Sequence, residues 1–114
     1  MKKIVAIIIL IIVSQGIVHA QNHAAKPYST QIKPGLYPEG SSQLLRPANM
    51  EGLTSWDLKV MRNEIFARHG YIFKSQDLAD YFEQQSWYVP KYNEVTGLLS
   101  SVEKKNILFI KKYE

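Results

Sequence analysis

One charged cluster in the sequence carries the residue types that acid–base chemistry uses. It lies between Arg62 and Gly70 and contains Glu64, Arg68 and His69. Glu64 and Arg68 are four residues apart, so on a helix they face each other in the order that favours an ion pair. His69 is the candidate general acid–base, and Glu64 is the candidate group to orient it. The spacing argues against this second pair, because five residues place two helical side chains about 140° apart.

Other catalytic and metal-binding arrangements have less support. No motif places a Ser or Thr beside a base as a nucleophile. Asp57 and Glu64 lie about 10.5 Å apart along a helix axis, beyond the usual separation of paired catalytic carboxylates. His69 is the only histidine in the C-terminal two thirds of the chain, and no second ligand accompanies it at metal spacing. We therefore expect no metal site and no cofactor.

The same cluster also suits a structural role. An imidazole at the C-terminal end of a helix can bond the last free carbonyls, and Gly70 suits the left-handed position that follows. The guanidinium groups of Arg62 and Arg68 can hold a neighbouring aromatic loop by stacking or by binding its carbonyls. The residues expected to be structural are Asn63, Glu64, His69, Gly70 and Asn106.

An aromatic loop supplies a third kind of candidate site. Trp87, Tyr88 and Tyr92 offer flat surfaces on which sugar rings can stack. The alternative is that these three side chains are buried in the core. Together with Arg62 and Arg68 they form the predicted binding set. Four lysines near the C-terminus carry positive charge that would attract an anionic polymer: Lys104, Lys105, Lys111 and Lys112.

Three helices are predicted to position these residues. Thr54 and Asp57 fit a capping box, which predicts a helix over 55–69 with Gly70 as its stop. Its expected apolar stripe consists of Leu58, Met61, Ile65 and Phe66. Ser75 can cap a second helix over 76–85, whose buried side is expected to contain Leu78, Tyr81 and Phe82.

A second capping box, Ser100 to Glu103, begins the last predicted helix, which runs to about residue 113. Its expected buried face contains Val102, Asn106, Phe109, Ile110 and Tyr113. Because a buried amide must be hydrogen-bonded, Asn106 is expected to bond the backbone of the 87–92 loop or of the first helix near His69. The predicted fold is all-α, a three-helix domain with an aromatic-rich loop.

The N-terminal segment has the three parts of a secretory signal peptide. Lys2 and Lys3 precede the apolar run 4–13, and Val18-His19-Ala20 fits a cleavage site. The apolar run is shorter than the roughly 20 residues that a membrane span needs. We therefore expect cleavage after Ala20, a secreted or periplasmic product and no stable membrane insertion of that product. The predicted organisation is a signal peptide at 1–20, a Pro/Gly-rich linker at 21–43 and a domain at 44–114.

Charge and cysteine content narrow the function classes further. The chain has 14 basic and 10 acidic residues, and loss of Lys2 and Lys3 leaves 12 basic residues, a net charge of +2. Such a balance does not indicate a nucleic-acid binder, which would carry a clustered basic face. The absence of cysteine excludes disulfides and thiolate chemistry.

The run Phe66-Ala67-Arg68-His69-Gly70 resembles the motif of the YARHG domain family, with Phe66 at the position of the tyrosine. The resemblance covers about 44–114, and Tyr37-Pro38-Glu39 is similar to a segment that often precedes such domains. Further similar positions are Gly52-Leu53-Thr54, Trp56, Phe73, Tyr81-Phe82, Trp87-Tyr88 and 103–106. The resemblance implies a small bacterial extracellular or envelope module with a cell-wall binding role. Phe66 lacks the phenol, so chemistry that relied on that hydroxyl is not expected here.

These observations favour an exported, non-enzymatic module that binds a cell-envelope component such as peptidoglycan or a glycopolymer. One alternative is an envelope-acting hydrolase that uses His69 with neighbouring charged residues. The other is a protein-interaction module, whose partner would be an envelope protein.

Overall fold

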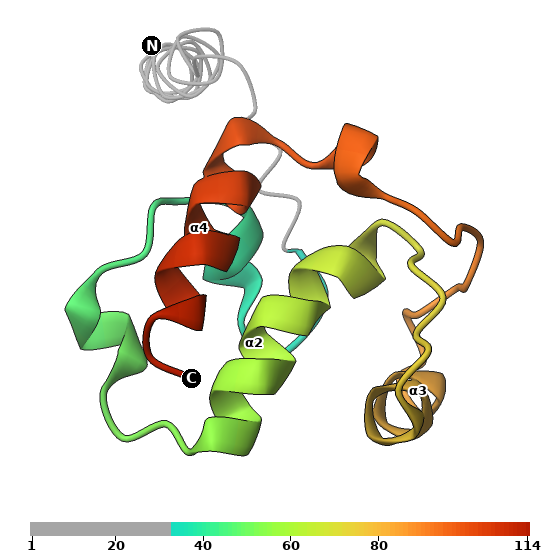
Figure 1. Cartoon of the computed structure of the whole chain (residues 1–114), viewed down its shortest axis with the longest axis horizontal. Helices are drawn as coiled ribbons and strands as arrows, with labels where there is room; N and C mark the ends of the chain where they lie inside the picture. The colour runs from blue at the N-terminus through green and yellow to red at the C-terminus, as the bar shows by residue number, and fades with distance from the viewer. Residues whose placement is uncertain (1–32) are drawn as a thin grey trace, which may run out of the picture. The chain divides into compact units, whose positions relative to one another are not determined.

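The computed structural model describes residues 33–114, which form three α-helices joined by 3-10 turns (Figure 1). The predicted signal peptide and most of the predicted linker lie outside the described residues. The helices are α2 (Ser55–Arg68), α3 (Gln76–Glu83) and α4 (Ser101–Lys111), and the turns are η1 (Pro38–Ser41), η2 (Pro47–Met50) and η3 (Thr96–Leu98). Extended pairing in this part of the chain is limited to a single parallel bridge between Tyr71 and Tyr92. The fold class is all-α, as predicted.

Both predicted capping boxes are present. Thr54 Oγ1 accepts a hydrogen bond from Asp57 N, and the Asp57 carboxylate accepts one from Thr54 N in return. Ser100 and Glu103 make the same reciprocal pair at the start of α4. These contacts satisfy backbone donors that a helix start would otherwise leave free. No helix in residues 33–114 has the length and apolarity to cross a membrane.

Helices α2 and α4 run antiparallel and hold the larger of two apolar clusters between them (Figure 1). His69 at the end of α2 meets Glu103 at the start of α4, whereas Arg62 pairs with Glu114 beyond the end of α4. The buried members of this cluster are Leu45, Met50, Leu58, Met61, Ile65 and Ile110. The pairing fixes the end of α2 beside the start of α4.

The second cluster packs α3 and the aromatic loop, residues 87–92, against the C-terminal end of α2. Phe73 and Phe82 stack at its centre with ring centroids 4.6 Å apart, and Ala67 and Leu78 complete its buried part. Trp87 and Tyr88 are half-buried against it. The core therefore covers part of both aromatic rings of the loop that the sequence offered as stacking surfaces.

Two predicted apolar faces differ from the structure. The single stripe expected on α2 is incomplete, because Val60, Glu64 and Ala67 are also buried. α2 is covered on several sides, since both clusters use it. On α4 the buried residues are Glu103, Asn106 and Ile110. Tyr113, expected on that face, is 43% exposed.

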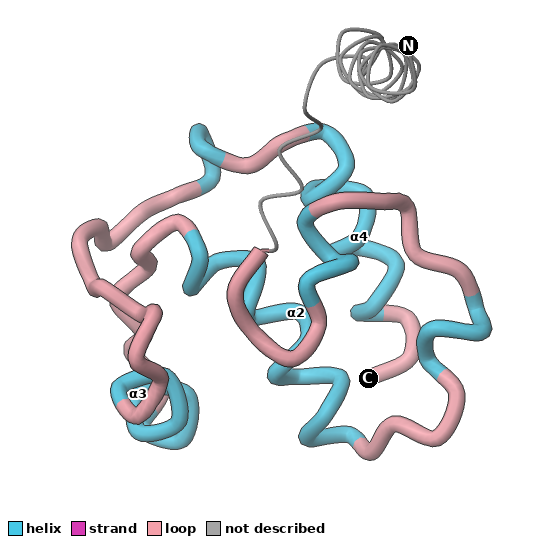
Figure 2. The backbone as a smooth tube through the Cα atoms, turned by 180° about the vertical axis from the view of Figure 1, so that it is seen from behind, coloured by secondary structure: helices cyan, strands magenta, loops and turns pink. Residues whose placement is uncertain are grey.

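The segment 34–45, here called the strap, belongs to the folded domain. Composition assigned most of it to a linker ending at residue 43, but it contacts both α2 and α4 (Figure 2). Leu36 N and Tyr37 N donate to the buried Glu64 carboxylate. The prolines and glycines therefore form turns that hold the strap in place, and the boundary of the domain moves from 44 to the mid-thirties.

Asn106 fastens the other end of the strap. Its amide nitrogen donates to Gly40 O at 2.8 Å and Gln43 O at 2.7 Å, and its oxygen accepts from Leu45 N at 2.9 Å. The prediction that Asn106 is buried and satisfied is confirmed. The predicted partners, the aromatic loop or the end of α2, are wrong because Asn106 bonds the backbone of the strap with every polar atom of its side chain.

Gly35 has a backbone φ of +114°, and an added Cβ would lie 2.4 Å from Glu64 Oε2. Gly35→Ala should lower the free energy of unfolding by about 3 kcal/mol or more, because it combines backbone strain with a clash against a buried group. Gly52 has φ +73° but open space around it, so Gly52→Ala should cost only about 1 kcal/mol. Gly97→Ala, with neither feature, should change stability little. Urea denaturation measures all three, and equal effects at Gly35 and Gly52 would contradict the clash.

Asn106→Leu keeps a similar volume but removes every hydrogen bond to the strap. The variant should lose about 3–5 kcal/mol of stability, because Leu45 N and two carbonyls are left buried without partners. Thermal unfolding followed by circular dichroism measures the loss. The matched control is Asn93→Leu at an exposed loop position. If the Asn106 variant had the same melting temperature as this control, the hydrogen bonds of Asn106 to the strap would not stabilise the domain.

Candidate functional site

The end of α2 is where the strap, α4 and the aromatic loop meet, and the motif 66–70 supplies the contacts. Phe66 and Ala67 face the aromatic cluster, with Ala67 buried and Phe66 packed beside it. Arg68, His69 and Gly70 each contact a different segment, as described below. Consecutive residues of the motif therefore contact different parts of the domain, and the end of α2 is the junction between those parts.

Arg68 binds the strap through every nitrogen of its guanidinium. Nε donates to Pro34 O, Nη2 donates to Tyr37 O at 2.8 Å, and Nη1 donates to Ser41 Oγ at 2.7 Å. Nη2 also lies 3.3 Å from Glu64 Oε1, in the predicted i,i+4 ion pair. The side chains are 5% and 1% exposed, so both charges are held by hydrogen bonds in the interior, which a buried pair requires.

Burial dominates the ionisation of this pair. It raises the pKa of Glu64 above its ordinary value, although the Leu36 and Tyr37 N–H groups and the Arg68 charge act in the opposite direction. Burial likewise lowers the pKa of Arg68, and the nearby carboxylates oppose this. The guanidinium stays protonated, because its ordinary pKa lies far above neutral.

His69 pairs with Glu103 of α4. Its Nε2 lies 2.9 Å and 3.0 Å from the two oxygens of that carboxylate. Glu103 also accepts from Ser41 Oγ and from Ser100 N. Burial raises the pKa of Glu103, but the hydrogen bonds from Ser100, His69 and Ser41 outweigh it and hold that pKa below its ordinary value.

Gly70 connects α2 to the aromatic loop. It adopts φ +83°, and an added Cβ would lie 3.0 Å from Val89 O. Its carbonyl accepts hydrogen bonds from Lys91 N and Tyr92 N at 2.8 Å and 2.9 Å. A left-handed residue without a side chain is therefore needed both to end the helix and to admit the loop.

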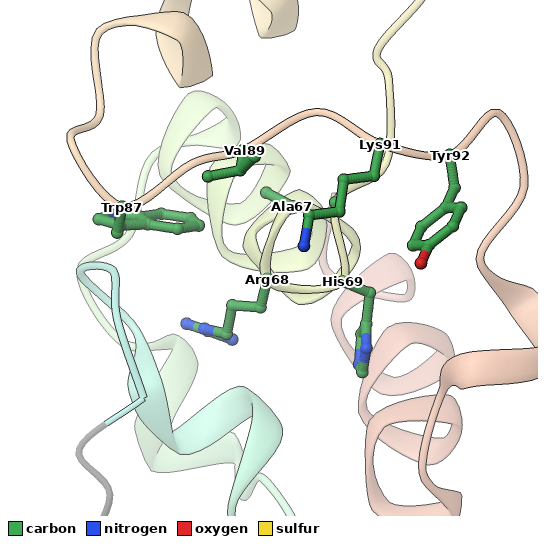
Figure 3. Close-up of a pocket in the computed structure, with 8 residues that line it drawn as sticks. Ala67, Arg68, His69, Trp87, Val89, Lys91 and Tyr92 are labelled. Carbon is green, nitrogen blue, oxygen red and sulfur yellow. The ribbon is translucent and has the colours of Figure 1, made fainter.

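A shallow pocket of about 210 Å³ opens at this junction. In Figure 3, Arg68 and His69 extend from the end of α2, while Trp87, Val89, Lys91 and Tyr92 reach it from the aromatic loop. Tyr92 is 48% exposed, and Trp87 is half-buried. The pocket thus has one aromatic side chain at each end, with Lys91 and the end of α2 between them (Figure 3).

The structure separates the predicted binding residues into two groups. Arg68, Trp87 and Tyr92 line the pocket. Tyr88 does not line it, because its ring packs into the core and its hydroxyl donates to Tyr71 O. Arg62 is held at the surface by Glu114. The idea that Arg62 and Arg68 tie down the aromatic loop is wrong, since Arg68 ties down the strap instead.

The predicted structural residues are placed as follows. Asn63 is buried and donates from its amide to Lys59 O within α2. Glu64 does not orient His69, which agrees with their spacing on the helix, because Glu64 faces the strap while Glu103 binds the imidazole. In residues 33–114 no three Asp, Glu or His side chains converge as a metal site would require.

Four residues of the junction were not singled out as site residues from the sequence: Gly35, Ser41, Lys91 and Glu103. Glu103 carried a signal, because it occupies the acidic position of a capping box. That pattern predicts its bond to Ser100 but not its second use as the partner of His69. The contacts of Ser41 and Lys91 depend on where the strap and the loop lie, which no local pattern reveals.

The family assignment agrees with this arrangement. The family model for the YARHG domain matches residues 34–114, and the chain belongs to the YARHG domain family. The match begins at Pro34, so Tyr37-Pro38-Glu39 is part of the domain and does not merely precede it. No curated protein matches the chain, and no solved structure does.

Glu103→Gln should destabilise the domain by about 1–3 kcal/mol near neutral pH, because a neutral amide cannot satisfy three donors as a carboxylate does. The folded-state pKa of Glu103 lies below its ordinary value of 4.5. The ionised group therefore stabilises the fold above that value, and the contribution is lost as the pH falls through the folded-state pKa. The stability difference between wild type and variant should therefore be present at neutral pH and shrink as the pH falls below 4.5.

Urea titrations across this pH range measure the difference. Glu51→Gln, at an exposed position, is the matched control and should give a small difference at every pH. A Glu103→Gln penalty that stays constant down to the acid limit would contradict the assignment.

Proposed function

We propose that this protein is an exported, non-enzymatic module that binds a cell-envelope component such as peptidoglycan or a glycopolymer. Export rests on the signal-peptide pattern of residues 1–20. Binding rests on one observation: an exposed tyrosine and a half-exposed tryptophan flank a pocket that also carries cationic groups. Carbohydrate rings have apolar faces that stack on such aromatic surfaces.

The contacts that hold the aromatic residues in place support this proposal. Trp87 packs against Phe82 with ring centroids 6.1 Å apart, and the backbone of Tyr92 is bonded to Gly70 and Ile72. The Trp87 ring and the backbone that carries Tyr92 are therefore held before a ligand arrives, which lowers the conformational entropy lost on binding.

The size of the pocket favours weak binding of one unit of a polymer. Its volume of about 210 Å³ is below the ~300–1,000 Å³ of pockets that enclose small molecules. A repeating polymer offers many such units side by side, so a domain released from one unit finds others at a high local concentration. Weak single-site affinity is thus compatible with retention on the envelope.

A second candidate function is hydrolysis of an envelope polymer, and the His69–Glu103 pair favours it. A carboxylate that holds one imidazole nitrogen leaves the other able to accept a proton. The competing observation is that Glu103 also joins Ser41 and the cap of α4, and no hydroxyl of residues 33–114 hydrogen-bonds His69. These contacts favour a structural role for the pair.

Tyr92→Ala should weaken retention of the purified protein on peptidoglycan sacculi about three- to tenfold, the effect of removing one aromatic contact. Its melting temperature should stay near that of wild type, because the side chain is largely exposed. Sedimentation with sacculi measures retention. Tyr113→Ala is the matched control, since this tyrosine is 43% exposed and does not line the pocket.

Three outcomes would count against the proposal. Absence of wild-type protein from the pellet would exclude sacculi as the partner and favour a protein-interaction module. If Tyr92→Ala and Tyr113→Ala weakened retention on sacculi equally, the pocket would not be the binding site. Release of soluble fragments by wild type but not by His69→Gln would favour the hydrolase.

A further inference from the structure

The pocket at the end of α2 is electrostatically one-sided. Three of its lining residues, Arg68, His69 and Lys91, carry nitrogen groups that are cationic or can become so. The other lining residues are Ala67, Gly70, Trp87, Val89 and Tyr92, and none is acidic. Arg68 is paired with Glu64 and His69 with Glu103, so the Lys91 ammonium is the lining charge that has no carboxylate partner among residues 33–114. This uncompensated charge favours an anionic group over a neutral sugar.

The three groups differ in what they have left to offer a ligand. Arg68 uses all three guanidinium nitrogens for the strap and Glu64, so it has no free donor and its charge is compensated by the Glu64 carboxylate. His69 uses Nε2 for Glu103, and its Nδ1 has no hydrogen-bond partner within residues 33–114. The Lys91 ammonium likewise makes no hydrogen bond or ion pair with the described residues.

Lys91 is also placed by the fold. Its backbone N–H donates to Gly70 O at 2.8 Å, and its Cβ lies 3.3 Å from the point that a Cβ on Gly70 would occupy. Its side chain therefore extends from the aromatic loop across the end of α2, between Trp87 and Tyr92 (Figure 3). The missing side chain at Gly70 is what leaves room for it.

We propose that this pocket binds an acidic sugar residue, with its carboxylate against Lys91 and His69 and its ring against Tyr92, the aromatic side chain on the same side of Lys91 as His69 (Figure 3). This inference rests on the proposed function and names the ligand class for the same site. A carboxylate has two oxygens, and the site offers two nitrogen groups. The ammonium of Lys91 donates to one oxygen, and Nδ1 of His69 donates when the ring is protonated or accepts from a sugar hydroxyl when it is neutral.

The dimensions agree with one such residue. About 210 Å³ holds a pyranose ring only in part, so the ring remains partly exposed and continues into a polymer on either side. The carboxylate is the part that the pocket selects, because charged hydrogen bonds are stronger than neutral ones.

The test uses three soluble probes: an oligogalacturonate, its methyl ester and a glycerol-phosphate polymer. The first two share the same ring and differ in charge, and the third carries phosphate in place of carboxylate. Binding is measured by ¹⁵N NMR titration, with the amide signals of Gly70, Lys91 and Tyr92 as local reporters. The variants are Lys91→Gln, Lys91→Arg and the matched control Lys105→Gln, which removes an exposed lysine of α4 outside the pocket.

Wild type should bind the oligogalacturonate at least about tenfold more tightly than its ester, the worth of one charge-assisted hydrogen bond. Lys91→Gln should remove this preference, Lys91→Arg should keep it, and Lys105→Gln should change affinity less than about twofold because its charge is remote and screened. Unchanged thermal melts would show that each variant is folded.

Several results would overturn the inference. Equal binding of acid and ester would remove the carboxylate contact. If Lys91→Gln and Lys105→Gln weakened binding equally, the effect would come from the net charge of the protein and not from the pocket. A Lys91-dependent response to the phosphate polymer alone would assign the pocket to phosphate. Retention on sacculi without a response to any soluble probe would overturn this inference and leave the proposed function, whereas a carboxylate response without retention would do the reverse.

Discussion

The structure depends on a buried carboxylate and a buried guanidinium that must be fully hydrogen-bonded. Glu64 and Arg68 lie in the interior of a small domain, where an unsatisfied charge would cost more than the fold can lose. α2 cannot supply their remaining partners, because its own backbone groups are already paired. The strap supplies them with Leu36 N, Tyr37 N and the carbonyls of Pro34 and Tyr37. A segment whose one helical part is the short turn η1 is thereby held against α2.

The four consecutive residues from Ala67 to Gly70 are each constrained by a contact with another part of the domain. Ala67 is limited by the aromatic cluster, Arg68 by the strap, His69 by α4 and Gly70 by the loop. Each contact is made to a segment distant in sequence, so a change at one of these positions cannot be offset by a neighbour. The pocket is a by-product of this junction: the loop and the helix end are held close together, but they are not in full contact.

Local physics predicted the helices well. Thr54 with Asp57, and Ser100 with Glu103, are short-range patterns whose hydrogen bonds form within one turn, and Gly70 ends α2 for a reason visible in its own backbone. Local patterns could not identify the strap as part of the domain, because its prolines and glycines are typical of a linker. Its place becomes clear only from the contacts of Glu64 and Asn106, which lie far away in the sequence. For the site, spacing correctly excluded a Glu64–His69 pair but could not reveal Glu103, which lies 34 residues from His69.

The attachment of the strap to α4 also sets the order in which the domain can fold. Asn106 bonds residues 61 to 66 positions earlier in the sequence, so the first and last described segments are closed by the same side chain. Loop-closure entropy must be overcome before these contacts contribute, which makes them late events. An emerging chain that lacks α4 has no Asn106 to bond Gly40 O, Gln43 O and Leu45 N. The strap can therefore be fastened at both ends only after the last helix is available, so the final residues of the chain complete the binding of its first described segment.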